Sequence, residues 1–195
     1  MKAQHCFRSG FVGRSLAICV AAFGTFSLPV QAVQLANGTV YFNHPPRLLG
    51  ARTTEKSIRV WGAKYYFTLS VPTDAGEPLQ RVAIAQREGV DNIRFRLKDT
   101  QAFVGEGRRQ PLSLGAVTFD QPTQAVSVTF NPPVPPGQTV TVRLVPRRNP
   151  DVSGVYLFGV TALPAGEKVS GQFLGFGRLH FYDSFNGFGS FWNFR

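Results

Sequence analysis

Tyr65-Tyr66-Phe67-Thr68-Leu69-Ser70-Val71 is the stretch of sequence that decides the fold. Large apolar or aromatic residues take every second position, and tyrosine, threonine or serine stands between them. Successive side chains of a β-strand point to opposite faces of the sheet. The pattern therefore predicts a strand with one face in a core and the other in water.

Alternation of the same kind recurs along the chain and predicts further strands. It is clearest at 93–98, 126–130 and 140–144, where apolar residues alternate with basic or hydroxyl-bearing ones. Weaker patterns predict strands near 39–43, 80–86, 114–119, 154–163 and 171–182. The stretch 154–163 is apolar on both faces, so we expect it to lie at the centre of a sheet or to be covered.

The segments between these strands are typical of turns. Residues 72–78 and 120–124 contain proline and aspartate, which favour turns. The prolines of 131–137 have no N–H to donate, so we do not expect a ladder strand there. A helical turn is expected only at 53–59. About nine short strands with such turns predict an all-β fold, an immunoglobulin-like two-sheet β-sandwich.

The first 32 residues have the three parts of a signal peptide. Basic residues precede an uncharged apolar run at Leu16–Leu28, and small residues at Val30 and Ala32 suit signal peptidase. A membrane-spanning helix needs about 20 apolar residues, so this run favours a cleaved signal over an anchor. We expect cleavage between Ala32 and Val33 and export by the general secretory route. The location is then extracytoplasmic, and periplasm or medium remain alternatives.

The chain after the signal is expected to form one domain, 33–183, followed by a tail at 184–195. Cys6 and Cys19 both lie in the signal, which excludes disulfides, thiolate metal sites and a Cys nucleophile in the mature protein. The signal also holds three of the 21 basic residues, which leaves 18 against 11 acidic ones, a net charge of +7. A basic surface attracts anionic partners, and after export these are acidic polysaccharides or envelope components rather than a cognate nucleic acid.

Motifs of known catalytic chemistry are absent from the sequence. The mature chain has only His44 and His180, and no HExxH, Gly-x-Ser-x-Gly, P-loop or EF-hand pattern. We therefore expect no metal, no cofactor and no enzymatic activity. A hydrolase that uses either histidine with a nearby carboxylate remains an alternative hypothesis.

Gly171–Asp183 is the most suggestive stretch for binding. If it is one strand, one face is expected to be core and the other to mix aromatic rings with basic groups, the combination that holds sugars. The expected core face carries Phe173, Gly175, Gly177, Leu179 and Phe181, and the other carries Leu174, Phe176, Arg178, His180 and Tyr182. Alternatively, these rings are packing residues covered by a loop or the tail.

A basic row and an aromatic tail are the other candidates for contact. Arg94, Arg96 and Lys98 form one face of the strand predicted at 93–98, and either bind an anion or keep a sheet edge soluble. Residues 184–195 have five aromatic residues among Gly, Asn and Ser. This tail is either a terminal segment that is partly disordered or tucks over the domain, or a segment that pairs with a partner or stacks on sugar rings.

Several motifs resemble one family of exported cyanobacterial proteins, catalogued as domain of unknown function number 2808 (DUF2808). They lie at 37–48, 65–67, 76–79, 131–137, 154–158 and 171–183. The resemblance runs from about Gln34 to Asp183 and implies a secreted or periplasmic β-rich domain. It brings no established activity, cofactor or site residue.

The sequence favours a non-enzymatic binding protein for an anionic or carbohydrate cell-surface component. The expected contact residues are Phe176, Arg178, His180, Tyr182, Arg94, Arg96 and Lys98. The alternative is a structural or assembly subunit of the cell envelope or extracellular matrix that recruits protein partners by strand addition.

Overall fold

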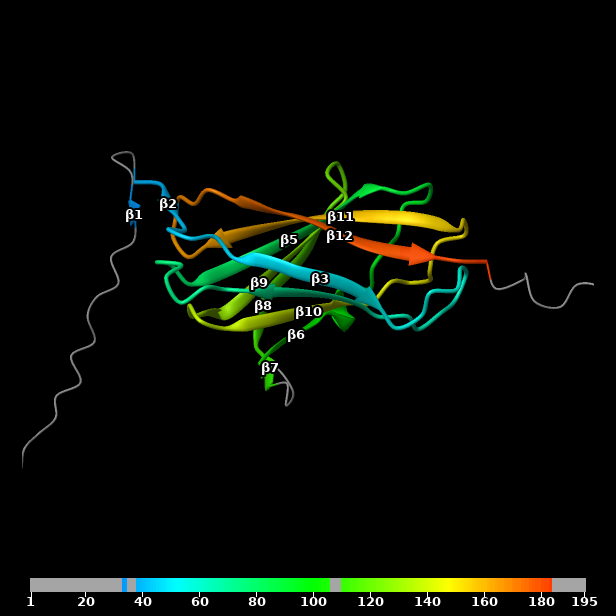
Figure 1. Cartoon of the computed structure of the whole chain (residues 1–195), viewed down its shortest axis with the longest axis horizontal. Coiled ribbons are helices and arrows are strands. Elements are labelled where there is room, and N and C mark those ends of the chain that lie inside the picture. The colour runs from blue at the N-terminus through cyan, green and yellow to red at the C-terminus, as the bar shows by residue number, and fades with distance from the viewer. Residues whose placement is uncertain (1–32, 35–37, 106–109, 184–195) are drawn as a thin grey trace, which may run out of the picture.

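Two five-stranded antiparallel sheets pack face to face in the computed structural model (Figure 1). It describes residues 33–34, 38–105 and 110–183. A small sheet of β1 (Val33–Gln34) and β2 (Val40–Tyr41) lies at one end. The architecture confirms the predicted immunoglobulin-like two-sheet β-sandwich. The predicted signal peptide, the Ala32 side of its cleavage site and the 184–195 tail lie outside the described residues.

The first sheet has the order β3-β4-β10-β6-β7. Its strands are β3 (Arg47–Thr53), β4 (Tyr65–Ser70), β10 (Thr139–Leu144), β6 (Gln101–Val104) and β7 (Gln110–Leu112). The register of β4 and β10 sets Phe67 opposite Val142 and Leu69 opposite Val140. All four side chains are fully buried, so the alternation read from the sequence does mark the core face of both strands.

The second sheet has the order β12-β11-β5-β9-β8. Its strands are β12 (Gln172–Phe181), β11 (Gly154–Pro164), β5 (Leu79–Glu88), β9 (Ala125–Val134) and β8 (Leu114–Asp120). β11 lies between β12 and β5, which agrees with its apolar character on both faces. The turn predicted at 120–124 joins β8 to β9.

Aromatic rings from both sheets form the centre of the core. Tyr65 and Phe67 of β4 meet Phe158 of β11 with ring centroids 6.2 and 5.6 Å apart, and Phe181 of β12 lies 5.6 Å from Tyr65. Most of these pairs meet edge to face, the arrangement that aromatic quadrupoles favour. The two sheets are therefore joined by ring contacts that no strand pairing supplies.

One buried polar group ties the end of the sandwich to this core. Asn149 is 2% exposed; its Oδ1 accepts a 2.8 Å hydrogen bond from the Tyr65 hydroxyl, and its Nδ2 donates to the carbonyls of Ser57 and Glu55. Burial raises the pKa of Tyr65, so the hydroxyl remains a donor. The loop after β3 and the connection after β10 are thereby held together.

The strand predicted at 93–98 is wrong, although its alternation is right. Ile93 is buried, Phe95 and Leu97 are half-buried, and the basic residues between them are exposed. The segment makes only one bridge, Phe95 to Pro146, and ends in the short 3-10 helix η1 (Leu97–Asp99). The segment connects β5 in one sheet to β6 in the other. Apart from this bridge, it belongs to the ladder of neither sheet.

The exclusion of a strand from 131–137 is also wrong in part, because β9 continues to Val134. Its prolines donate nothing, but the pairing needs little from them: Val134 lies opposite Leu79 across a register shift in β5. The Asn131 N–H donates to the Ser113 carbonyl at 3.1 Å. The end of a strand can therefore contain proline where the sheet requires few backbone N–H donors from it.

The remaining differences concern edges and short strands. The expected helical turn at 53–59 is absent: β3 includes Thr53, and bends and turns follow. β3 was not predicted because a register shift between Leu48 and Gly50 breaks its alternation. β6 and β7 are only four and three residues long, too short to show a period.

Within the described ranges, no helix has the length and apolarity needed to cross a membrane.

Truncating the central ring should destabilise the fold. Phe158→Ala is expected to lower the free energy of unfolding by about 3–5 kcal/mol, because a cavity opens between the sheets. Phe176→Ala on the exposed face of β12 is the matched control and should change it by about 0.5 kcal/mol at most. Urea denaturation measures both, and equal effects would contradict the description of the core.

Candidate functional site

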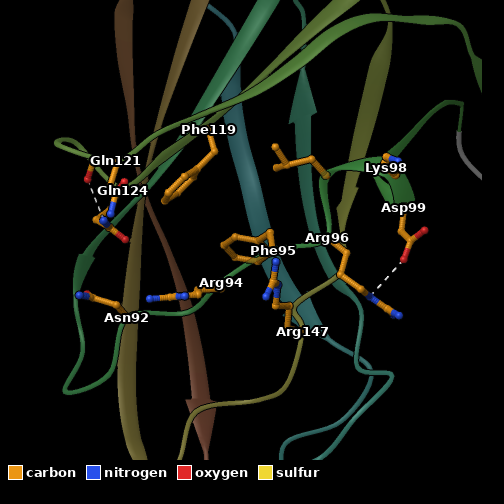
Figure 2. A pocket seen from close by; sticks show the side chains of 11 residues that line it. Asn92, Arg94, Phe95, Arg96, Lys98, Asp99, Phe119, Gln121, Gln124 and Arg147 are labelled. Atoms are coloured by element: carbon orange, nitrogen blue, oxygen red, sulfur yellow. Dashed lines mark hydrogen bonds and ion pairs between the residues drawn. The ribbon is translucent and has the colours of Figure 1, made fainter.

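A hollow of about 740 Å³ opens between the crossing segment 92–99 and the β8–β9 hairpin (Figure 2). We call it the basic groove. It is lined by Asn92, Arg94, Phe95, Arg96, Leu97, Lys98, Asp99, Phe119, Gln121, Gln124 and Arg147. All three members of the basic row predicted from sequence are among these residues.

The crossing segment is held in place from both sides. The Phe95 ring packs against Tyr65 and Phe158 at centroid distances of 5.9 and 6.3 Å. The Arg96 N–H donates to the Val145 carbonyl, and the Arg147 N–H to the Arg94 carbonyl, at 2.8 and 2.7 Å. With Phe95 anchored inward, the neighbouring arginines must point outward.

Gln86 of β5 fixes the beginning of the same segment. Its Nε2 donates to the Asp91 carbonyl at 2.5 Å, and its Oε1 accepts from the Ile93 N–H at 2.9 Å. One amide side chain thus satisfies a backbone acceptor and a backbone donor in a stretch that has no strand neighbour at that point. The start of the basic row is positioned by this contact.

The charge of the basic groove is only partly neutralised. Arg96 pairs with Asp99, with Nε 3.1 Å from Oδ2. Arg94, Lys98 and Arg147 have no ion pair with any residue that the structure describes. The groove therefore presents an excess of positive charge. Arg147 was missed in the sequence, where it follows a buried strand and carries no alternation of its own.

Aromatic and amide groups accompany these cations. Phe119 lies opposite Val126 in the β8–β9 register, on the side of β8 that faces the core, yet it is 37% exposed because the groove leaves it uncovered. Figure 2 shows the rings of Phe119 and Phe95 between the amides of Asn92, Gln121 and Gln124 on one side and Lys98 on the other. Such a surface can offer an anion charged donors, a ring face and neutral hydrogen bonds.

The face of β12 that we expected to bind is also exposed, but the residues that lie on it differ in part from those predicted. Phe173, predicted to lie in the core, is 57% exposed, and Leu174, predicted to point outward, packs against the core. The cause is a bulge: Val160 lies opposite Gly175 and Thr161 opposite Phe173, so Leu174 is an extra residue and the alternation reverses before it. Gly175 supplies the positive φ of 114°.

The outer face of β12 is therefore more aromatic than the sequence indicated. Phe173 and Phe176 meet edge to face with centroids 5.1 Å apart, and both are more than half exposed. The His180 and Tyr182 rings stack at 6.4 Å and 18°. Arg178 lies between these two pairs and opposite Leu157 of β11. These five residues form what we call the β12 surface.

The two candidate surfaces are separate. β12 and β8 lie at opposite edges of one sheet with three strands between them. Arg178, His180 and Tyr182 are not among the residues that line the basic groove. The structure therefore does not bring Arg178, His180 and Tyr182 together with the basic row.

The histidines expected for a hydrolase occupy different surroundings. His44 Nδ1 lies 3.2 Å from Asp74 Oδ2, within hydrogen-bond reach, but about two thirds of each side chain is exposed and neither residue lines the basic groove. His180 stacks on Tyr182. Among the described residues, no group of three or more His, Cys, Asp or Glu side chains is placed to hold a metal ion.

The fold and its two basic, aromatic surfaces define a β-sandwich domain. Its family is the one described as "Protein of unknown function (DUF2808)", which matches residues 39–181, and the chain belongs to it. No curated protein matches the chain in sequence.

Solved structures with some similarity include proteins of Staphylococcus aureus and Streptococcus pyogenes. Collagen adhesin from S. aureus is 10% identical, with 61% of this chain and 44% of that chain covered and a TM-score of 0.38. A collagen-binding domain from a Staphylococcus aureus adhesin is 7% identical, with coverage of 69% and 96% and a TM-score of 0.38. The C-terminal domain of the Streptococcus pyogenes antigen I/II-family protein AspA is 12% identical, with coverage of 69% and 46% and the same TM-score. This chain thus spans less than half the length of the first of these chains.

Removing the Gln86 amide should loosen the start of the basic row. Gln86→Ala leaves the Ile93 N–H and the Asp91 carbonyl without their partner, so the Ile93 amide should exchange with solvent faster. Gln80→Ala is the matched control, because Gln80 in the same strand donates to the Phe130 carbonyl instead. Hydrogen exchange measures both variants. Unchanged exchange at Ile93 would show that Gln86 does not hold the segment.

Proposed function

We propose that this protein is a non-enzymatic, extracytoplasmic β-sandwich that binds an acidic cell-surface polysaccharide in the basic groove. The observation that carries the proposal is the convergence of Arg94, Lys98 and Arg147 on one hollow, without an ion pair to any described residue. The net charge of +7 expected after export supports it, because the positive charge of the whole mature protein also attracts an anion.

The lining suits a carboxylate-bearing sugar in particular. Arginine can donate two parallel hydrogen bonds to a carboxylate, and charge-assisted bonds are stronger than neutral ones. Amides at Asn92, Gln121 and Gln124 can exchange hydrogen bonds with sugar hydroxyls, and the exposed Phe119 ring can contact the apolar face of a sugar. A simple inorganic anion would use the cations alone.

Binding is favoured over hydrolysis by the chemistry of the lining. Glycoside hydrolysis requires two carboxyl groups on either side of the scissile bond. The one described carboxylate in the basic groove, Asp99, is paired with Arg96. The His44–Asp74 pair lies outside the groove.

The β12 surface is the second candidate for the same class of ligand. Arg178 between two aromatic pairs favours it, because rings and a cation together can hold an acidic sugar. Its rings are less suited as a platform than the groove, since Phe173 and Phe176 are inclined by 70° and cannot both lie flat on one chain. The alternative role as an assembly subunit rests on strand addition at exposed sheet edges and on residues 184–195, which lie outside the described ranges.

Neutralising the basic groove should weaken binding to an acidic polymer. The double variant Arg94→Gln/Arg147→Gln is expected to lower the affinity for polygalacturonate about tenfold or more, because two charge-assisted hydrogen bonds are lost. Neutral dextran should not bind either protein. Affinity electrophoresis over a series of salt concentrations gives the measurement, and the variant should also show a weaker salt dependence.

Two control variants decide where the polymer binds. Arg47→Gln/Arg81→Gln removes the same charge from exposed positions outside the groove, and should change the affinity little. Arg178→Ala/Tyr182→Ala tests the β12 surface. Equal losses for the groove variant and the charge control would remove the groove as the site, and a loss confined to the third variant would transfer the function to β12.

A further inference from the structure

A second, smaller hollow adjoins the basic groove. This hollow, of about 150 Å³, lies between residues 91–94 and 147–151. Asn92, Arg94 and Arg147 line both hollows, so the two adjoin along these side chains. A ligand that occupies both hollows therefore crosses these three side chains.

The second hollow differs from the first in its charge. Arg148 Nη2 lies 2.7 and 2.8 Å from the two carboxylate oxygens of Asp151, so this cation is neutralised. Asp91 Oδ2 accepts hydrogen bonds from the N–H groups of Asp151 and Val152 at 2.6 and 3.0 Å. Beyond Arg94 and Arg147, the described lining thus contributes two carboxylates and one paired arginine, which does not favour a further anionic group.

An exposed aromatic ring stands next to this second hollow. Trp61, in the loop between β3 and β4, is 72% exposed. The guanidinium carbon of Arg148, which lines the hollow, lies 5.8 Å from the centre of the Trp61 ring. A large flat ring beside a polar hollow that adds no free cation of its own suits the apolar face of an uncharged sugar unit.

Backbone strain occurs near both ends of the combined groove. In the described part of the chain, Arg59 and Gln124 are the non-glycine residues with positive φ, at 61° and 52°. Gln124 lines the first hollow, and Arg59 Nε lies 3.8 Å from Asp151 at the second. Such conformations are costly and concentrate where a fold positions groups for a ligand. The two residues thus adjoin one hollow each.

We infer that the two hollows together bind an internal stretch of a linear polysaccharide in which acidic units are spaced by uncharged ones. This inference rests on the proposed function and names its ligand class. An acidic unit lies among Arg94, Lys98 and Arg147, and the neighbouring uncharged unit lies in the second hollow against Trp61. The affinity then depends on the length of the chain and on the alternation of its charge.

The test is a titration with glucuronate alone and with defined oligosaccharides of alternating glucuronate and N-acetylglucosamine, two and four units long. Affinity should rise about tenfold or more from glucuronate alone to the two-unit oligomer, and Trp61→Ala should remove most of that gain without weakening the binding of glucuronate alone. Trp61→Phe should retain part of it. Leu49→Ala, an exposed apolar truncation on β3, is the matched control and should behave as the unaltered protein.

The outcomes separate this inference from the proposed function. Binding that is independent of length and of Trp61, or oligogalacturonates that bind as tightly as alternating oligomers of equal length, would overturn the two-hollow groove and leave the acidic-polysaccharide proposal standing. If neither the oligomers nor polygalacturonate bind, both fail. Thermal unfolding of each variant shows whether a lost affinity reflects a lost fold.

Discussion

The packing of the Phe95 ring against Tyr65 and Phe158 is the contact on which the rest of the structure depends. Those two partners come from different sheets, so one side chain of the crossing segment touches both. Because Phe95 is fixed inward, Arg94 and Arg96 are fixed outward. The hydrophobic effect that holds the sandwich together therefore also positions the charged lining of the basic groove.

Sequence alone could predict the fold class and most of the strands, because period-two alternation reports directly on which face is buried. In β4 and β10 this gave both the strand and its core residues. The crossing segment shows the limit. Its alternation correctly separated Phe95 from its basic neighbours, but the pattern cannot tell a sheet strand from an extended connection that makes a single bridge.

The candidate site was predictable only in part, for a similar reason. The basic row could be found from its spacing, whereas Arg147, Phe119 and the groove amides come from other segments and meet only through the tertiary fold. On β12, a single inserted residue exchanged the positions of Phe173 and Leu174, and no residue type marks such a bulge unambiguously in the sequence. Both surfaces contain aromatic rings that a strict alternation would have placed elsewhere or overlooked.

The route of the crossing segment has a mechanical consequence. It leaves the middle strand of one sheet, β5, and enters β6, an inner strand of the other. A tension applied to this segment is therefore shared by the hydrogen-bond ladders of two sheets, instead of peeling an edge strand from one of them. A force that a bound polymer exerts on this segment would therefore have to break hydrogen bonds in both sheets before the domain unfolds.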